Sequence, residues 1–234
     1  MAYQRVILKL SGEALGKSGS AFDNDKINQT ARVLCEIAKG GVQLGVVIGG
    51  GNLWRGRKAA PEMSVYAADQ IGMLGTVMNC MYLCDAVRTQ GQKACVQSAV
   101  EIPRFVETYS PPAALERLMS GHIVFFAGGS GNPCFSTDTP VALRAIELGC
   151  DAILMAKSID GVYTADPHID PKATLIKDLT YARAQKEQLG VMDLAAFDLL
   201  RRYNVPLVRV FSLDDPDNLR RVLEGDDMGT FVHP

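Results

Sequence analysis

Short, continuously apolar segments recur along the chain and alternate with longer segments that carry polar residues at helical spacing. Continuous apolar runs, unlike runs of alternating polarity, are typical of strands buried on both faces. Strands that alternate with helices indicate an α/β fold with a largely parallel sheet. The predicted strands span residues 5–10, 42–48, 94–96, 122–127, 152–156 and 207–211.

Two amphipathic helices have clear boundaries. The first places its apolar residues on one face over residues 27–37, with Asp23 or Asn24 as N-cap and a pair of glycines as its stop. The second begins at about Asp193, has two arginines in its last turn, and ends before Pro206. Together with the strands that alternate with them, these helices indicate an α/β fold with a largely parallel sheet.

A third helical segment, from about residue 64 to residue 88, is apolar around most of its circumference. Such a helix requires burial on more than one side. Gly72 and Gly75 within it would let another backbone approach closely. The sequence leaves two interpretations open for this helix, a subunit interface or simple packing in the core.

Composition narrows the class of protein. With 234 residues, of which 47% are hydrophobic, the chain can bury the core of one domain spanning residues 1–234. It has 24 basic and 26 acidic residues, so its net charge is close to zero. Such a chain has no overall positive electrostatic potential that would attract nucleic acid or an anionic membrane. Arg5 and Lys9 interrupt the first apolar stretch, whereas the apolar region of a signal peptide is continuous. No segment of the sequence has the roughly 18 uninterrupted apolar residues of a membrane span. The six cysteines lack CxxC spacing, so we expect reduced, buried thiols in a cytoplasmic protein.

Ligands of open α/β sheets bind beyond the carboxyl ends of the strands, and two candidate phosphate-binding turns lie there. Residues 9–12 place the Lys9 ammonium and free N–H groups at a strand end, although an ordinary turn would look the same in isolation. Residues 49–51 are three glycines after a buried strand, and Arg55 follows with a fork suited to phosphate oxygens. Trp54 stands where a dinucleotide fingerprint needs its third glycine, which disfavours an oxidoreductase.

A third turn, residues 127–138, combines small hydroxyl side chains, the Asn132 amide and the Asp138 carboxylate, which can hydrogen-bond a polar heterocycle. A helix is expected to begin near Asp138, which adds N–H groups and a positive dipole end. For this turn alone, an ordinary loop with Asp138 as a helix N-cap is equally compatible with the sequence. The sequence has no Walker P-loop or protein-kinase motif. The remaining interpretation for a protein that binds phosphates is a kinase whose phosphate site is built from glycine turns at strand ends.

Five ordered motifs resemble the bacterial uridylate kinases of the amino-acid-kinase superfamily. They are KLSGEAL at 9–15, VVIGGGNL at 46–53, GNP at 131–133, DGVYTADP at 160–167 and VMDLAA at 191–196. The resemblance extends from residue 9 to residue 212 and implies a three-layer α/β/α sandwich around a mainly parallel sheet. It also implies Mg²⁺ and ATP as donor, UMP as acceptor, a place in pyrimidine nucleotide biosynthesis, and an allosteric hexamer built from dimers.

The resemblance also assigns site residues by position. The ATP contacts that it implies are Lys9, Leu10, Ser11, Gly12, Gly51 and Arg55, with Lys157, Tyr163 and Asp166 at the nucleoside part. The UMP contacts that it implies are Gly50 at the phosphate, Asp69 as an acidic contact, and a uridine loop of Ser130, Gly131, Asn132, Pro133, Cys134, Phe135, Ser136 and Thr137. Lys9, Arg55 and Asp138 would serve the transfer, with Asp138 orienting Lys9 or the waters of the metal.

The chain departs from the family pattern at Ser130, where a threonine is expected, and at Cys134, where an aromatic residue is expected. The residue directly before Phe22 is Ala21, where family members activated by GTP have a glycine, which argues against activation by GTP, while UTP stays a candidate inhibitor. Two alternatives remain open: a kinase for a small carboxylate or carbamate, and a non-catalytic ATP-binding protein of the same superfamily. The joint presence of the charged site residues argues against the second.

Overall fold

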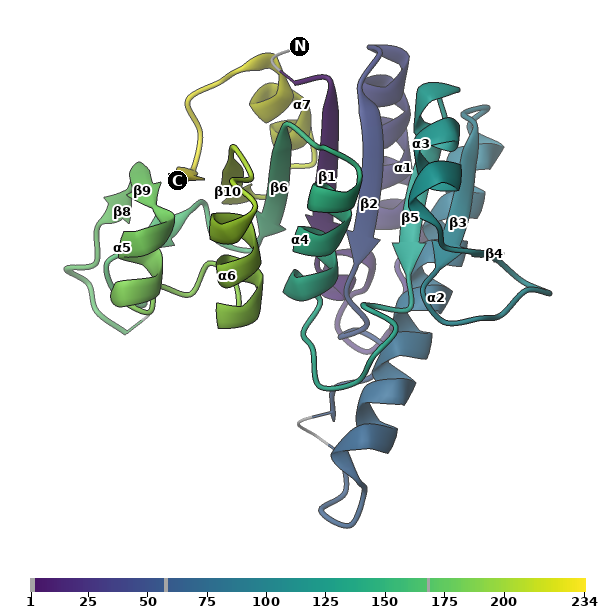
Figure 1. The fold of residues 1–234 in the computed structure, drawn as a ribbon, viewed down its shortest axis with the longest axis horizontal. Coiled ribbons are helices and arrows are strands. Elements are labelled where there is room, and N and C mark those ends of the chain that lie inside the picture. Colours follow the sequence, from purple (N-terminus) through teal and green to yellow (C-terminus); the bar gives the residue numbers. More distant parts are fainter. Residues whose placement is uncertain (1–2, 57–58, 168) are drawn as a thin grey trace.

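The computed structural model describes residues 3–56, 59–167 and 169–234, and within these ranges nine strands form one sheet (Figure 1). Across the sheet the order is β4 (Glu107–Thr108), β3 (Ala94–Ser98), β5 (Ile123–Ala127), β2 (Gln43–Ile48), β1 (Arg5–Leu10), β6 (Ala152–Lys157), β10 (Val208–Ser212), β11 (Thr230–His233) and β9 (Asp178–Thr180). In this sheet β10 and β11 pair antiparallel and the other pairs are parallel. The mainly parallel sheet is confirmed, and the six predicted strands form within two residues of their expected ends.

The helices of the described ranges are α1 (Asn24–Lys39), α2 (Val65–Thr89), α3 (Pro111–Met119), α4 (Asp138–Glu147), α5 (Tyr181–Lys186), α6 (Leu194–Arg202) and α7 (Asp217–Glu224), with the 3-10 helix η1 (Gly12–Leu15). A separate hairpin pairs β7 (Val162–Tyr163) with β8 (Leu175–Ile176). Asp23 caps α1 by accepting from two backbone N–H groups, and Asp193 caps α6 by accepting from Ala196. The predicted helices at these positions and the helix beginning at Asp138 are confirmed.

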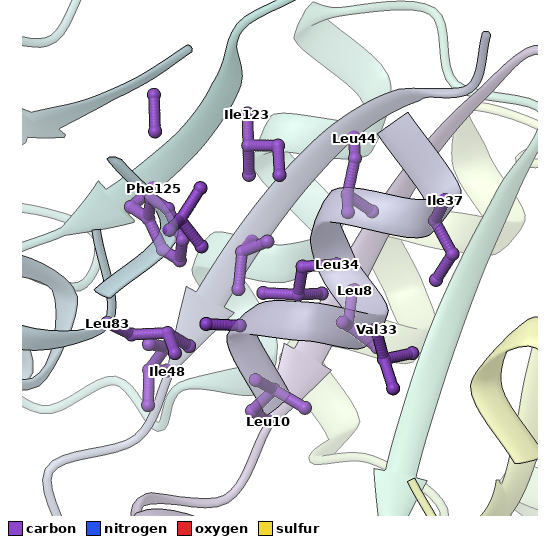
Figure 2. Packing of buried hydrophobic residues seen from close by; sticks show 14 of the residues in the cluster. Leu8, Leu10, Val33, Leu34, Ile37, Leu44, Ile48, Leu83, Ile123 and Phe125 are labelled. Carbon is purple, nitrogen blue, oxygen red and sulfur yellow. The ribbon is translucent and has the colours of Figure 1, made fainter. Parts of the chain in front are cut away.

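Successive residues of each central strand point to opposite faces, which divides the core in two. On one face Leu8 of β1 packs in a cluster with Leu34 of α1 and Leu83 of α2 (Figure 2). On the other, Ile7 belongs to a cluster with Phe197 of α6. In Figure 1, α4 and α6 lie in front of the strands and α1 lies behind them. The predicted three-layer α/β/α sandwich is therefore confirmed.

Five of the cysteines are buried, and burial raises the pKa of Cys84 to about 11, so these thiols stay protonated. Cys134 is exposed, so the prediction of buried thiols is wrong at this position, because the residue lies in a loop outside the sheet. None of the helices in the described residues is both long enough and apolar enough to span a membrane.

Candidate active site

Two clefts open at the carboxyl ends of the parallel strands and meet at one shared wall. The β6 cleft has a volume of about 750 Å³, and its lining includes Lys157 at the end of β6 and, after this strand, Tyr163 and Asp166. The α2 cleft, of about 730 Å³, lies between α2 and the loop that precedes α4. The residues that line both clefts are Lys9, Gly50, Gly51 and Thr137. These four residues are called the junction below.

The junction is built around an ion pair. Lys9 Nζ, at the end of β1, lies 2.5 Å from Asp138 Oδ1 at the start of α4, and both side chains are largely buried. The other carboxylate oxygen, Asp138 Oδ2, accepts a hydrogen bond from the backbone N–H of Asp193 at 3.2 Å. Asp138 therefore does not cap α4 with its side chain. This geometry is the one expected if Asp138 orients Lys9.

One glycine in each of the two phosphate-type turns, Gly12 and Gly50, has no room for a side chain. A Cβ on Gly12 would lie 2.4 Å from the Gly49 carbonyl oxygen, and one on Gly50 would lie 2.6 Å from the Gly72 carbonyl oxygen of α2. Gly75 likewise faces the Gly50 backbone. The close approach expected at Gly72 and Gly75 therefore occurs within the chain. A Cβ on Gly51 would meet nothing within 4 Å, so its backbone is open to a ligand.

Two amides hold the 49–51 turn in place. Buried Asn79 of α2 donates from Nδ2 to the Gly49 carbonyl at 2.7 Å and to Asn52 Oδ1 at 2.8 Å. Asn52 Nδ2 donates in return to Asn79 Oδ1 at 3.1 Å and to the Ala21 carbonyl at 2.8 Å. Because these groups are satisfied by one another, the turn keeps its backbone N–H groups in a fixed position.

Helix α2 also holds the loop that precedes α4. Thr76 Oγ1 accepts from the backbone N–H of Gly128 at 2.9 Å. Asp69 Oδ2 accepts from the backbone N–H of Cys134 at 2.7 Å, and Cys134 has a φ of 69°, which is uncommon outside glycine. The Asp69 carboxylate thus lines the α2 cleft and fixes the backbone of its opposite wall at the same time.

The predicted uridine loop divides into lining and shaping residues. The residues that line the α2 cleft are Asn132, Pro133, Phe135, Ser136 and Thr137. Ser130 instead exchanges hydrogen bonds with the backbone of Asn132, and Gly131 has a φ of 85°. Thr137 also lines the β6 cleft, which places it at the junction.

Lys157 lines the β6 cleft near the Lys9–Asp138 pair of the junction. Its Nζ donates to the carbonyl oxygens of Gly190 at 2.7 Å and Val191 at 2.8 Å. Burial and the nearby Lys9 ammonium lower the pKa of Lys157 to about 8, while Asp138 opposes that shift. Further along the β6 cleft, the Tyr163 hydroxyl donates to Asp160 at 2.8 Å, and Asp166 lines the same wall.

Three further predicted ATP contacts lie around the same turns. Arg55 lines the α2 cleft and not the β6 cleft, pairs with Glu13, and donates from Nε to the Gly51 carbonyl at 3.3 Å. Leu10 is buried and presents only its backbone, whose carbonyl accepts from Gly49 at 3.0 Å. Ser11 lines the β6 cleft and caps η1.

Sequence reasoning gave no site role to several residues that shape the clefts. Trp54 lines the α2 cleft and donates from Nε1 to the Ala68 carbonyl at 2.8 Å. Asn79 looked like one more polar residue of an apolar helix. Asp193 stood in a matched motif, and its hydrogen bonds to α4 appear only in the folded chain.

A family model and several solved structures are similar to this chain. A family model described as the amino acid kinase family matches residues 4–212. The solved UMP kinase from Bacillus anthracis aligns with a TM-score of 0.95 and 36% identity, over 100% of this chain and 97% of that chain. The UMP kinase from Ureaplasma parvum aligns with a TM-score of 0.93 and 33% identity, over 100% of both chains. The uridylate kinase from Archaeoglobus fulgidus aligns with a TM-score of 0.73 and 26% identity, over 97% of this chain and 99% of that chain. The resemblance found in the sequence is confirmed, and the chain belongs to the amino acid kinase family.

Proposed function

We propose that this protein transfers the γ-phosphoryl group of ATP to UMP, giving ADP and UDP, a step of pyrimidine nucleotide biosynthesis. The observation that carries the proposal is the pair of clefts that meet at Lys9. Each cleft, at about 750 and 730 Å³, has a volume in the usual range for small-molecule sites. ATP in the β6 cleft and UMP in the α2 cleft would bring their phosphates together at the junction. The names of the similar solved structures support UMP as the acceptor.

The chemistry needs no general base. The acceptor is a phosphate oxygen that is already an anion at neutral pH, so no proton has to be removed. The obstacle is repulsion between two phosphate anions, which cations and aimed N–H groups reduce while they hold donor and acceptor in line. Lys9 and the N–H groups of the 49–51 turn lie where both phosphates would be. Asp138 holds the Lys9 ammonium in that position.

Mg²⁺ would arrive with ATP and neutralise charge on the phosphates. Among the residues that the structure describes, no group of three or more His, Cys, Asp or Glu side chains could hold a metal ion. Mg²⁺ in kinases is commonly held by phosphates, waters and one or two carboxylates, so a cation carried mainly by ATP fits this donor set. Asp138 contributes a carboxylate at the junction.

Acceptor specificity would come from the α2 cleft. Uracil presents a carbonyl acceptor at C4 where cytosine presents an amino donor, and the Asn132 amide on the cleft wall can donate to that carbonyl. A polar site rejects a mismatched partner because buried groups are left unpaired, at about 1–3 kcal/mol each. We therefore expect kcat/KM for UMP to exceed that for CMP by at least about a hundredfold.

One coupled assay tests the proposal. Purified protein is supplied with ATP and, in turn, UMP, CMP, AMP, GMP and small carboxylic acids. UMP should be the preferred acceptor. Comparable turnover of UMP and CMP would rule out uridine recognition, a preference for a small acid would favour the alternative kinase, and no turnover would favour an ATP-binding protein without catalysis.

The proposal extends to assembly and control. The exposed apolar residues of α2 are Val65, Tyr66, Ile71, Leu74, Met78 and Met81. An exposed apolar stripe on one helix is typical of a subunit interface, which supports a homo-oligomer, with a hexamer built from dimers as the expected form. UTP carries the same uridine and would compete with UMP in the α2 cleft. One continuous sheet supports a single domain over residues 1–234, and the chain is proposed to act in the cytoplasm.

A further inference from the structure

Asp193, the residue that caps α6, makes hydrogen bonds to three different parts of the site. Its Oδ1 accepts from the Ala196 backbone N–H at 2.7 Å, which is the helix cap. Its Oδ2 accepts from the hydroxyl of Ser136, in the wall of the α2 cleft, and from Thr139 Oγ1 of α4 at 3.3 Å. Its backbone N–H donates to Asp138 Oδ2 at 3.2 Å.

These bonds form a continuous chain from the predicted uridine loop, residues 130–137, to the junction. Because this loop would hold the acceptor, it is called the acceptor loop below. Ser136 is bonded to the Asp193 carboxylate, the Asp193 backbone to Asp138, and Asp138 to Lys9. We propose that Asp193 is a positioning residue for phosphoryl transfer, which sets the acceptor loop through Ser136 and the Lys9–Asp138 pair through its backbone. The inference rests on the proposed function and adds a residue to its acceptor side.

The Asp193 carboxylate joins the α4 end of the loop to α6, whereas the contacts with α2 lie earlier in the loop. Thr76 and Asp69 of α2 hold Gly128 and Cys134. Ser136 Oγ donates to Asp193 Oδ2 and accepts from the backbone N–H of Asp138 at 3.0 Å. Without the Asp193 carboxylate, the end of the loop nearest the junction would lose this anchor.

The donor side is attached separately. Lys157 reaches the carbonyl groups of Gly190 and Val191, which belong to the same segment as Asp193 but do not involve its side chain. A change confined to the Asp193 side chain therefore leaves these contacts with the β6 cleft in place. The expected signature is a weakened acceptor site and slower transfer, with nearly normal affinity for ATP.

The capping and positioning functions can be separated by choice of substitution. Asparagine and serine are good N-caps, so Asp193→Asn and Asp193→Ser both keep the start of α6. Asparagine retains the reach but exchanges one acceptor oxygen for an amino group, and serine is too short to span to Ser136. Asp198→Asn is the matched control, because Asp198 lies on the same helix, is exposed, and pairs with Arg201 of its own helix rather than with the site.

The experiment measures steady-state kinetics and direct binding. Trp54, the only tryptophan in the sequence, lines the α2 cleft, so its fluorescence reports the Kd of UMP without ATP. For Asp193→Ser we expect the Kd and KM of UMP to rise about tenfold, the worth of one lost charge-assisted hydrogen bond, and kcat to fall about tenfold or more. The KM of ATP should stay within about twofold, Asp193→Asn should lie between wild type and Asp193→Ser, and the control should match wild type.

A double variant sharpens the test. Ser136→Ala removes the bond to Asp193 from its other side and also removes the acceptor for the Asp138 N–H. Because the bond to Asp193 is shared, the combined effect of Ser136→Ala and Asp193→Ser on UMP binding should be clearly smaller than the sum of the two single effects. Additive losses would overturn the inference, as would Asp193 variants with wild-type UMP affinity and kcat, or an equal rise in the KM of ATP and UMP. A wild-type protein that does not phosphorylate UMP would remove the proposed function and this inference with it, whereas an active wild type with normal variants overturns the inference alone.

Discussion

Lys9→Met tests the junction most directly, because methionine fills the same space without the charge. Lys9 lines both clefts and pairs with Asp138 at 2.5 Å. A unit charge about 4 Å from a phosphate charge contributes about 4 kcal/mol at the effective dielectric constant of a protein surface. Where that interaction strengthens as charge develops in the transition state, its loss slows turnover by about three orders of magnitude.

The same substitution has a separate effect on stability. With Lys9 removed, the Asp138 carboxylate keeps its hydrogen bond from the N–H of Asp193, but a largely buried anion loses its cation. Since both side chains retain some exposure, we expect a loss of about 1–3 kcal/mol in the free energy of unfolding. Replacing the partner as well, in Lys9→Met/Asp138→Asn, should restore much of that stability without restoring activity.

The assay is therefore a pair of measurements on three proteins. Turnover is followed by coupled ADP release with saturating ATP and UMP, and stability by denaturant unfolding. Slow turnover in both variants, with stability recovered in the double variant, would separate catalysis from folding. A Lys9→Met enzyme with kcat within about tenfold of wild type would refute the reasoning, because then the ammonium does not act on the transition state.

Three further predictions follow from individual contacts. Asp69→Asn keeps an acceptor for the Cys134 N–H but removes a charge from the α2 cleft. The KM of UMP should therefore rise about fivefold, with less change in the KM of ATP, and an equal rise in both KM values would contradict this. The pKa of Lys157 is lowered to about 8, so its ammonium is present below that pH, and kcat/KM for ATP should fall as pH rises through it. Lys157→Arg stays charged and should abolish that fall, and a profile unchanged by the substitution would refute the assignment. Met78→Lys places a charge on the exposed face of α2 and should shift the mass measured by light scattering to smaller species, whereas an unchanged mass would argue against the interface.

Local pattern in the sequence determined most of the central sheet. The strands β1, β2, β5, β6 and β10 are continuous apolar runs, and such runs are buried wherever the chain places them. The strand-end turns were equally visible, because three glycines after a buried strand indicate a close backbone approach. Shorter elements escaped notice. β11 has four residues and α5 has six, which is too short for a periodic signal.

The tertiary structure decided which residues share a site. Lys9 and Asp138 are separated by 129 positions, and Asp193 reaches α4 across more than 50, so no local pattern joins them. Packing of α4 and α6 on one face of the sheet brings these side chains together, as packing of α2 on the other face brings Asp69 to the acceptor loop. The sequence determined the chemistry available at each strand end, because that depends on residue type and local conformation. Only the packing of three layers decided which of those groups meet at the junction, because hydrogen bonds and ion pairs depend on distances between segments far apart in the chain.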